Sequence, residues 1–411
     1  MRLFENAAWQ TVDQVVGRGL LFAFYLAVPL TIGLEEYGRF AFLQSLVVLL
    51  VQPALFLGLE TLVVAGVAGG DRAVFAAALQ LRLLALAFTA IIIVPVSTWA
   101  SPENRRVVLL LWLYHGAHGL LSLVFAHFRG TESMRMEAIT GVSQKAIALP
   151  LLVVLPLAGV GDALLPALTL ALVGVGGALM LLGPYRHAVI PVLHEMRWRR
   201  LDDPDLRRVA RDGTRLGMAG FVGVAYFRLG SALLGLLGGH QAVGGYAAAF
   251  RIMEAAQILP IVATNVGLPR LVRAADPPAA ALRWTTVLAA CGLLVSGGLL
   301  FAAEDLIALL YGPAFAAAGT ALRILSFAVA PIYAGFMLTQ ALVVIHRTDA
   351  YLRIALTSVL LNVVLNLILI PVGGANGTAV ATVATEVAVA VMGVRILLAP
   401  PPSARATRRP P

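Results

Sequence analysis

The fold class is decided by residues 350–398, AYLRIALTSVLLNVVLNLILIPVGGANGTAVATVATEVAVAVMGVRILL. This stretch contains two mainly apolar runs, 350–371 and 376–398, and each has the length of about 20 residues that one helical membrane crossing requires. A Gly-rich break at 372–376 separates them. One uninterrupted helix would be about twice as long as a bilayer needs, so the break predicts two crossings joined by a tight turn.

The composition extends this reading to the whole chain. Of 411 residues, 60% are hydrophobic and only 12% are charged, against about 25% charged in a soluble domain. We therefore predict an all-α polytopic membrane protein, which excludes nearly all soluble enzyme folds, DNA-binding modules and secreted scaffolds. The single Cys291 excludes a disulfide framework and a cysteine metal site.

Division at Gly, Pro and charged residues predicts about twelve transmembrane helices. The N-terminus lacks a signal-peptide cleavage site, so it is expected to lead into the first helix. The expected crossings are 12–33, 39–60, 77–99, 107–128, 137–158, 163–183, 213–237, 242–268, 281–303, 318–345, 350–371 and 376–398.

Arginines gather in alternate connections, although the formal net charge of the whole chain is only +9. The rich set comprises Arg2, Arg72, Arg129, Arg135, Arg186, Arg197, Arg199, Arg200, Arg207, Arg208, Arg211, Arg270, Arg273, Arg347, Arg405, Arg408 and Arg409. The opposite set has only Arg39, Arg105 and Arg106. Because positive charge stays on the cytoplasmic side, both termini are predicted to be cytoplasmic. An odd number of crossings would mix the two sets.

A weak internal repeat divides the crossings into two halves. Gly38 and Phe40 recur as Gly244 and Tyr246, 206 residues later. This predicts two six-helix lobes related by a parallel internal repeat, with the ligand site between them. The expected divisions are an N-terminal lobe 1–183, a cytoplasmic basic linker 184–212, a C-terminal lobe 213–399 and a disordered cytoplasmic tail 400–411. The linker fits a helix on an anionic leaflet and a solvated connection equally well.

Polar residues inside the expected crossings are candidates for function, because burying them in a membrane is costly. They form stripes at helical spacing: Gln10, Gln14 and Arg18; Arg251 and Glu254; Ser358, Asn362 and Asn366; Thr378, Thr382 and Glu386; His115, His118 and Ser122. Arg228 lies in the middle of the seventh crossing. Aligned polar faces of this kind are what a water-filled cleft needs.

Simpler explanations exist for each candidate. Arginines can extend to the headgroups, and asparagines can join helices by hydrogen bonds. His115 and His118 lack an evident third metal ligand, so packing is the better interpretation and no metal site is predicted. Glu386 could bind a coupling cation or pair with an arginine, and Lys145, the only lysine, could contact substrate or anchor a helix end.

Enzyme functions have little support. The outward connections are short, their only paired carboxylates are Glu35 with Glu36 and Glu304 with Asp305, and no Gly-rich phosphate loop with a following lysine occurs. The sequence thus favours a transporter that does not itself hydrolyse ATP.

The segment NVVLNLILIPVGGANGTAVATVATE, residues 362–386, resembles the C-terminal signature of bacterial polysaccharide transporters, the oligosaccharide flippases of the Wzx type. Their superfamily includes multidrug and toxin extruders and lipid II flippases. Residues 33–46, 243–271 and 305–325 look like further parts of the same pattern. The resemblance covers most of the chain.

This resemblance implies a multi-pass carrier in the bacterial inner membrane that moves a polyprenyl-diphosphate-linked oligosaccharide to the periplasmic leaflet. Arg18, Arg228 and Arg251 are expected to bind the diphosphate, and Gln14, Asn362 and Asn366 to line the sugar path. No cofactor is expected, and coupling to an H⁺ or Na⁺ gradient would involve Glu254 or Glu386. The expected partners are the lipid-linked glycan, membrane lipids, a polysaccharide polymerase and glycosyltransferases, with no nucleic acid.

Two departures from the family pattern matter. Gly230 and Ser231 stand where members often have an acidic residue in the seventh helix, and residues 63–66 are neutral where members often have a basic one. Three rival functions stay open: a cation-coupled drug antiporter of the same superfamily, an integral-membrane enzyme acting on lipid-linked sugar, and a non-transporting scaffold of polysaccharide assembly. The glycan could belong to O-antigen, capsule or exopolysaccharide.

Overall fold

The computed structural model describes residues 2–55, 58–71, 73–183, 186 and 198–399. Their regular structure consists of helices, with no strand within these ranges. Eight of the described helical stretches are long and apolar enough to cross a membrane, and the bent pair Pro204–Met218 and Phe221–Leu237 adds a ninth. The expected all-α polytopic fold is confirmed, and the chain is a multi-pass membrane protein.

Two of these stretches are long enough for two crossings each. Ala8–Ala68 has 61 residues and Thr348–Leu398 has 51, whereas about 20 suffice for one crossing. Each is interrupted by a glycine with non-helical backbone angles, Gly33 in the first and Gly374 in the second. If both count as two crossings and the shorter apolar helix Leu164–Met180 as one, the described helices account for the twelve expected crossings.

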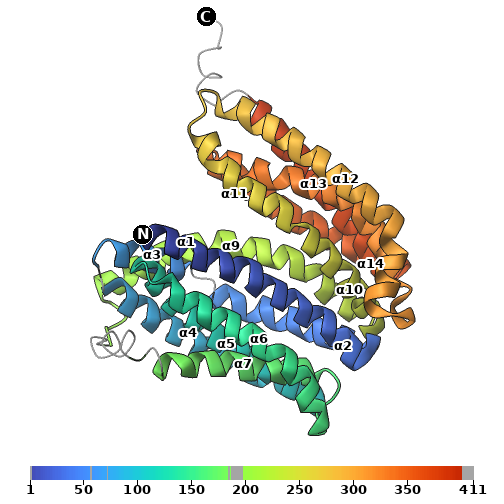
Figure 1. Ribbon diagram of the computed structural model, residues 1–411, viewed down its shortest axis with the longest axis horizontal. Helices are drawn as coiled ribbons and strands as arrows, with labels where there is room; N and C mark the ends of the chain where they lie inside the picture. Colours follow the sequence, from blue (N-terminus) through green and yellow to red (C-terminus); the bar gives the residue numbers. More distant parts are fainter. Residues whose placement is uncertain (1, 56–57, 72, 184–185, 187–197, 400–411) are drawn as a thin grey trace, which may run out of the picture. The chain divides into compact units, whose positions relative to one another are not determined.

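The chain divides into two compact units, Met1–Ala232 and Leu233–Pro411. The first contains α1 (Arg2–Val12), the π-helix η1 (Asp13–Gly17), α2 (Arg18–Leu55), α3 (Leu59–Ala68), α4 (Ala73–Thr98), α5 (Pro102–Gly130), α6 (Met134–Leu157), α7 (Leu164–Leu182) and most of α9 (Pro204–Leu237). α5 packs against α2, α3, α4, α6 and α7, so it forms the centre of this unit (Figure 1).

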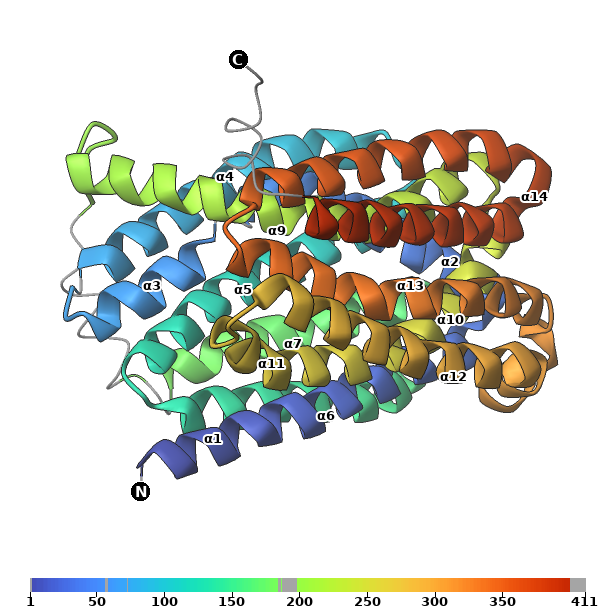
Figure 2. The ribbon, with the colours of Figure 1, turned by 90° about the horizontal axis from the view of Figure 1, so that it is seen from above.

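The second unit contains α10 (His240–Ala256), α11 (Ile258–Val272), α12 (Pro277–Tyr311), the 3-10 helix η2 (Pro313–Phe315), α13 (Ala318–Val344) and α14 (Thr348–Leu398). Figure 2 shows α12, α13 and α14 running alongside one another. α13 contacts α10, α11, α12 and α14 and is the centre of this unit. α5 and α13 are the fourth and tenth expected crossings, which correspond under the predicted repeat.

The break in α14 requires glycine at two positions, one because of its backbone angles and one because another part of the main chain lies close to it. Gly374 has φ 51° and ψ −126°, and positive φ strains residues that carry a Cβ. Three residues later, a Cβ on Gly377 would overlap the main-chain carbonyl oxygen of Leu369. Gly374 and Gly377 therefore permit the two halves of α14 to fold back on each other, as expected for two crossings with a tight turn.

The first unit extends to Ala232 and so includes most of α9. Leu206 and Val209, in the part of α9 that was expected to belong to the linker 184–212, are buried in the cluster formed by α3, α4 and α5. Apolar contacts of this kind place the start of α9 in the first unit. The tail 400–411 and residues 184–185 and 187–197 lie outside the described residues.

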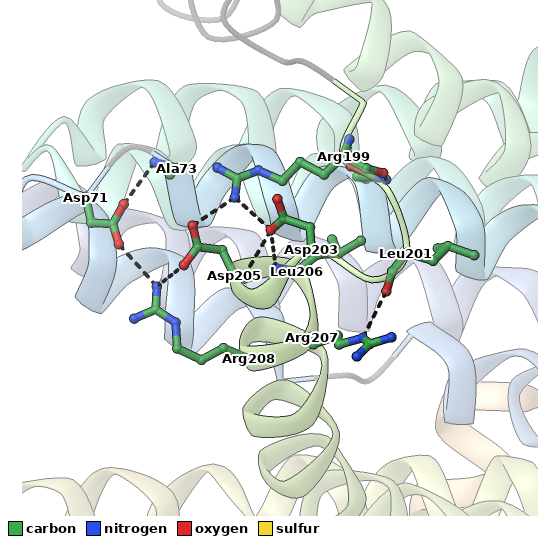
Figure 3. A network of polar contacts seen from close by, with 10 residues as sticks. Asp71, Ala73, Arg199, Leu201, Asp203, Asp205, Leu206, Arg207 and Arg208 are labelled. Atoms are coloured by element: carbon green, nitrogen blue, oxygen red, sulfur yellow. Dashed lines mark hydrogen bonds and ion pairs between the residues drawn. The ribbon is translucent and has the colours of Figure 1, made fainter.

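Polar contacts anchor the end of the linker to the first unit. The buried amide of Gln80 donates to the Arg199 carbonyl at 2.7 Å and accepts from the Arg199 N–H at 3.0 Å. Arg199 also pairs with Asp203 and Asp205 at 3.1 and 2.9 Å, and Arg208 reaches Asp205 at 3.4 Å and Asp71 at 3.6 Å (Figure 3). The contact with Asp71 ties the start of α9 to the α3–α4 connection.

Connections predicted to lie on one side of the membrane do meet at one end of the first unit. The Glu36 carboxylate near the bend in α2 accepts from the Ala163 N–H at the start of α7, at 3.0 Å. Arg39 pairs with Glu103 at the start of α5, at 2.8 Å. The alternation of connections agrees with the helix count, while the cytoplasmic placement of the termini stays a prediction.

Candidate functional site

The first polar cluster of the first unit joins α3, α4 and α5. Arg82 is only 2% exposed and its guanidinium pairs with Glu60 at 2.7 Å. The Ser122 hydroxyl also donates to Glu60 at 2.7 Å. Gly119 gives the arginine room, because a Cβ there would lie 2.9 Å from its Nη1. This cluster neutralises two charges within the apolar part of the unit.

A second cluster surrounds the π-helix η1. The ammonium of Lys145 on α6 pairs with the Asp13 carboxylate at 3.1 Å. Glycines make this approach close: a Cβ on Gly17 would lie 2.7 Å from Lys145 Nζ, and one on Gly141 2.8 Å from Asp13 Oδ1. Such π-helical turns are frequent at functional sites. Lys145 thus joins α6 to η1.

Arg18 and Arg228 differ from these paired charges. Arg18 is exposed at the start of α2, and Arg228 is half-buried in α9. Within the described residues, neither guanidinium has a hydrogen bond or an ion pair, although Arg228 is close enough to the half-buried His115 to interact with it electrostatically. The side chain of Gln14 lies outside what the structure describes.

The histidines of α5 pack with an aromatic ring. Tyr114 stacks on His118 with ring centroids 5.9 Å apart and contacts His115 at 5.0 Å. In the part of the chain that the structure describes, no three His, Cys, Asp or Glu side chains are grouped to hold a metal ion.

The second unit holds the remaining sequence-predicted residues. Arg251 and Glu254 form an ion pair of 2.7 Å on α10, as their spacing allows. Glu386 on α14 is 6% exposed. One turn before it, the Thr382 hydroxyl is hydrogen-bonded to Tyr246 of α10 at 3.1 Å. Arg251 therefore has a carboxylate neighbour, and Glu386 lies beside a polar contact between α10 and α14.

The two predicted asparagines contact each other. Asn366 donates from Nδ2 to the Asn362 carbonyl oxygen at 2.8 Å and to its Oδ1 at 3.0 Å. Asn362 is 3% exposed and Asn366 is fully buried. Both bonds lie within α14 and therefore do not connect it to another helix. The helix-joining interpretation and the contact with a glycan both stay predictions.

Sequence reasoning missed Glu60, Arg82 and Asp13. A signal was present, because Arg82 stands alone in the apolar run 73–98 and a charge inside such a run indicates function or a partner. Its partner could not be read from the sequence, since Glu60 belongs to another helix. In the described structure, Arg82 and Arg251 thus have carboxylate partners, whereas Arg18 and Arg228 do not.

These features define a polytopic α-helical membrane protein of two units, each with charged groups among its apolar helices. The chain belongs to the polysaccharide biosynthesis protein family, whose family model matches residues 3–275. The segment 362–386, which carries the most specific part of the sequence resemblance, lies beyond that match. No match was found among curated proteins.

Solved structures share the fold over nearly the whole chain. A lipid II flippase, MurJ, in an inward closed conformation matches with a TM-score of 0.72 and 12% identity over 96% of this chain and 87% of that one. An inward-facing multidrug resistance MATE family transporter of the MOP superfamily matches with 0.66 and 14%, over 92% and 97%. An outward-facing one matches with 0.64 and 16%, over 95% and 94%.

Proposed function

We propose that this protein carries a polyprenyl-diphosphate-linked oligosaccharide, a precursor of a cell-surface polysaccharide, across the inner membrane by alternating access. Arg228 carries the proposal: it is a half-buried arginine in an apolar helix that no carboxylate neutralises among the described residues. A positive charge within an apolar helix that lacks a carboxylate partner favours the binding of an anionic ligand. Arg18, at the start of α2, is exposed and likewise has no carboxylate partner among the described residues.

The chemistry of the substrate explains the need for such arginines. A diphosphate cannot cross hydrocarbon unaided, because removing its charges from water is very costly. Guanidinium groups form paired hydrogen bonds with phosphate oxygens and stay ionised when partly buried. In this proposal Arg18 and Arg228 bind the diphosphate first. Arg251, which pairs with Glu254 in the second unit, is a further proposed contact of the diphosphate.

The comparisons support a lipid-linked substrate over the rivals. The family is named for polysaccharide biosynthesis, and a lipid II flippase has the same fold. The MATE transporters share that fold as well, so a cation-coupled drug antiporter is the second candidate. Glu254 and Glu386 are the proposed sites of coupling to an H⁺ or Na⁺ gradient, and the polymerase and glycosyltransferases are proposed partners.

Translocation in proteoliposomes tests the proposal. A fluorescent polyprenyl-diphosphate oligosaccharide is followed by its exposure to an impermeant quencher, with wild type, Arg228→Gln and Arg215→Gln. Arg215 is an exposed arginine on the same helix and serves as the control. We expect Arg228→Gln to lose at least tenfold in rate, because one anion contact is worth about 1.5–3 kcal/mol, and Arg215→Gln to retain it.

Two results would contradict the proposal. Equal rates for Arg228→Gln and wild type would remove Arg228 from the path. Drug efflux by well-folded wild type that moves no lipid-linked glycan would favour the antiporter. Retention of polysaccharide export after replacement of Arg18, Arg228 and Arg251 would favour a scaffold. A change in the mass of the substrate would favour an enzyme.

A further inference from the structure

A charged cavity of about 210 Å³ lies at one end of the first unit. Three segments line it: α2 just after its bend, the start of α5, and the connection between α6 and α7. Their charged side chains are Arg39, Glu103, Arg106 and Asp162. The cavity is separate from Arg18, Arg228 and the buried clusters described above, none of which lines it.

One wall of the cavity is held in place by Arg39. Its guanidinium donates to Glu103 at 2.8 Å, to the Asn104 side-chain oxygen, and to Glu36 at 3.3 Å. Glu36 in turn accepts the N–H of Ala163 at the start of α7, at 3.0 Å, where a carboxylate is favoured by the helix dipole. The hydrogen bonds of Arg39 are therefore made within this wall, where Arg39 and Glu36 together connect α2, α5 and α7.

Two other side chains of the cavity have unused hydrogen-bonding capacity. Arg106 and Asp162 are exposed, and within the described residues neither makes a hydrogen bond or an ion pair. An arginine offers five N–H donors and a carboxylate about four acceptor positions. The cavity thus presents one set of donors and one set of acceptors to an occupant.

The balance of charge narrows the chemistry of that occupant. An anion would meet Glu103 and Asp162, and a cation would meet Arg39 and Arg106. A neutral molecule with many hydroxyl groups suits both, because each hydroxyl donates to a carboxylate and accepts from a guanidinium. The volume corresponds to about seven water molecules at about 30 Å³ each. It is smaller than the pockets of about 300 Å³ or more that hold drug-sized ligands, and it suits a single ring.

We propose that the cavity lined by Arg106 and Asp162 binds one sugar ring of the transported glycan. That the bound ring belongs to the transported glycan rests on the proposed function. The connections that form the cavity are those that the charge distribution predicts to face away from the cytoplasm. A ring bound there belongs to the part of the glycan that has reached the outer end of the first unit.

Saturation-transfer NMR with the purified full-length protein tests sugar binding directly. The probes are methyl glycosides of glucose, galactose, mannose, rhamnose and N-acetylglucosamine, with glycine as a zwitterionic probe. Wild type is compared with Arg106→Gln/Asp162→Asn and with Arg105→Gln. Arg105 is exposed beside Arg106 but does not line the cavity. Asn suits position 162, because it tolerates the positive φ of 57° found there.

We expect at least one glycoside to give a signal with wild type and Arg105→Gln that falls at least fivefold in the double variant, with unchanged melting temperature. The signal of the single Asp162→Asn variant should lie between those of wild type and the double variant. An unchanged signal in the double variant, a lack of signal from every glycoside, or a glycine signal that depends on these two residues would each overturn the inference.

The translocation assay keeps this inference separate from the proposed function. Wild type that moves the lipid-linked glycan but binds no glycoside would refute the sugar site alone. Wild type that binds glycosides through Arg106 and Asp162 but moves no lipid-linked substrate would refute the proposed function and leave a sugar-binding site.

Discussion

Arg82 shows how this protein accommodates a charge among apolar helices. It is one of the largest fully buried side chains of the described structure, and Glu60 is its carboxylate partner at 2.7 Å. A buried ion pair is weak evidence of stability in itself, but removing one partner leaves a charge that neither water nor a counter-ion compensates. Replacing one member of the pair should therefore lower the free energy of unfolding more than replacing both.

We expect Glu60→Gln to lower the free energy of unfolding by about 3 kcal/mol, and Glu60→Gln/Arg82→Met to recover most of that loss. Equilibrium unfolding in detergent micelles, followed by circular dichroism, measures both. Glu304→Gln is the control, since its pair with Arg323 is 59% and 47% exposed and should contribute less than about 1 kcal/mol. Equal losses for the single and double variants would argue against this account.

At the scale of elements, the break in α14 depends on a glycine that main-chain atoms crowd. A Cβ on Gly377 would overlap the Leu369 carbonyl oxygen, whereas one on Gly373 would meet nothing within 4 Å. A backbone atom in a helix cannot move aside as a flexible side chain can. The two glycines of one break thus provide a matched pair of substitutions.

Gly377→Ala should open the turn between the two halves of α14 and lower the melting temperature by several degrees, while Gly373→Ala should leave it nearly unchanged. The cost we expect for Gly377→Ala is about 1–3 kcal/mol, as for overpacking in a core. Differential scanning fluorimetry of the purified variants measures both. Similar melting temperatures for the two would show that the turn relaxes without cost.

The start of α9 should respond to pH. The pKa of the Asp203 carboxyl lies below its ordinary value, chiefly because the Leu206 N–H donates a hydrogen bond to the carboxylate at 3.1 Å. A lowered pKa stabilises the folded state at a pH above the unfolded value of about 3.9, and this contribution is lost as the pH falls through the folded value. Hydrogen exchange of residues 204–210, corrected for intrinsic rates, should therefore increase between pH 5 and pH 3.

Asp203→Asn should remove this pH dependence while retaining a helix cap, since Asn also caps N-termini well. Asp202→Asn is the control, because Asp202 is exposed and the described structure gives it no hydrogen bond or ion pair. An identical pH profile in Asp203→Asn and wild type would mean that another group controls the start of α9.

At the scale of the whole molecule, the distribution of arginines predicts that both termini are cytoplasmic, and the helix count agrees with both lying on the same side. Single cysteines in a Cys291→Ser background test it. Ser101→Cys and Gly161→Cys should react with an impermeant maleimide in cells whose outer membrane alone is permeabilised, and Glu132→Cys should react only after the inner membrane is opened. The reverse labelling would place both termini outside.

Each unit is organised around one central helix, α5 in the first and α13 in the second. Their equivalent positions among the expected crossings agree with the predicted repeat. The first turns of α9 bury Leu206 and Val209 against the first unit, which extends to Ala232. The end of the expected basic linker is thus packed against helices of that unit, and the expected limits of the two lobes stay a prediction.

By itself, the sequence determined the all-α polytopic class and the turn within residues 350–398. These are local properties: the length of an apolar run sets how far a helix can cross a bilayer, and Pro and Gly mark where it breaks. The i, i+3 spacing of Arg251 and Glu254 likewise places them on one face of α10, where they form an ion pair.

Only the tertiary structure decided which charges are neutralised. Glu60 and Arg82 are 22 residues apart and Asp13 and Lys145 are 132 apart, so the packing of different helices brings each pair together. The same packing joins Arg106 and Asp162 in one cavity and leaves Arg228 without a carboxylate among the described residues. A sequence states which charges exist, but the free energy of each depends on the neighbours that the fold supplies.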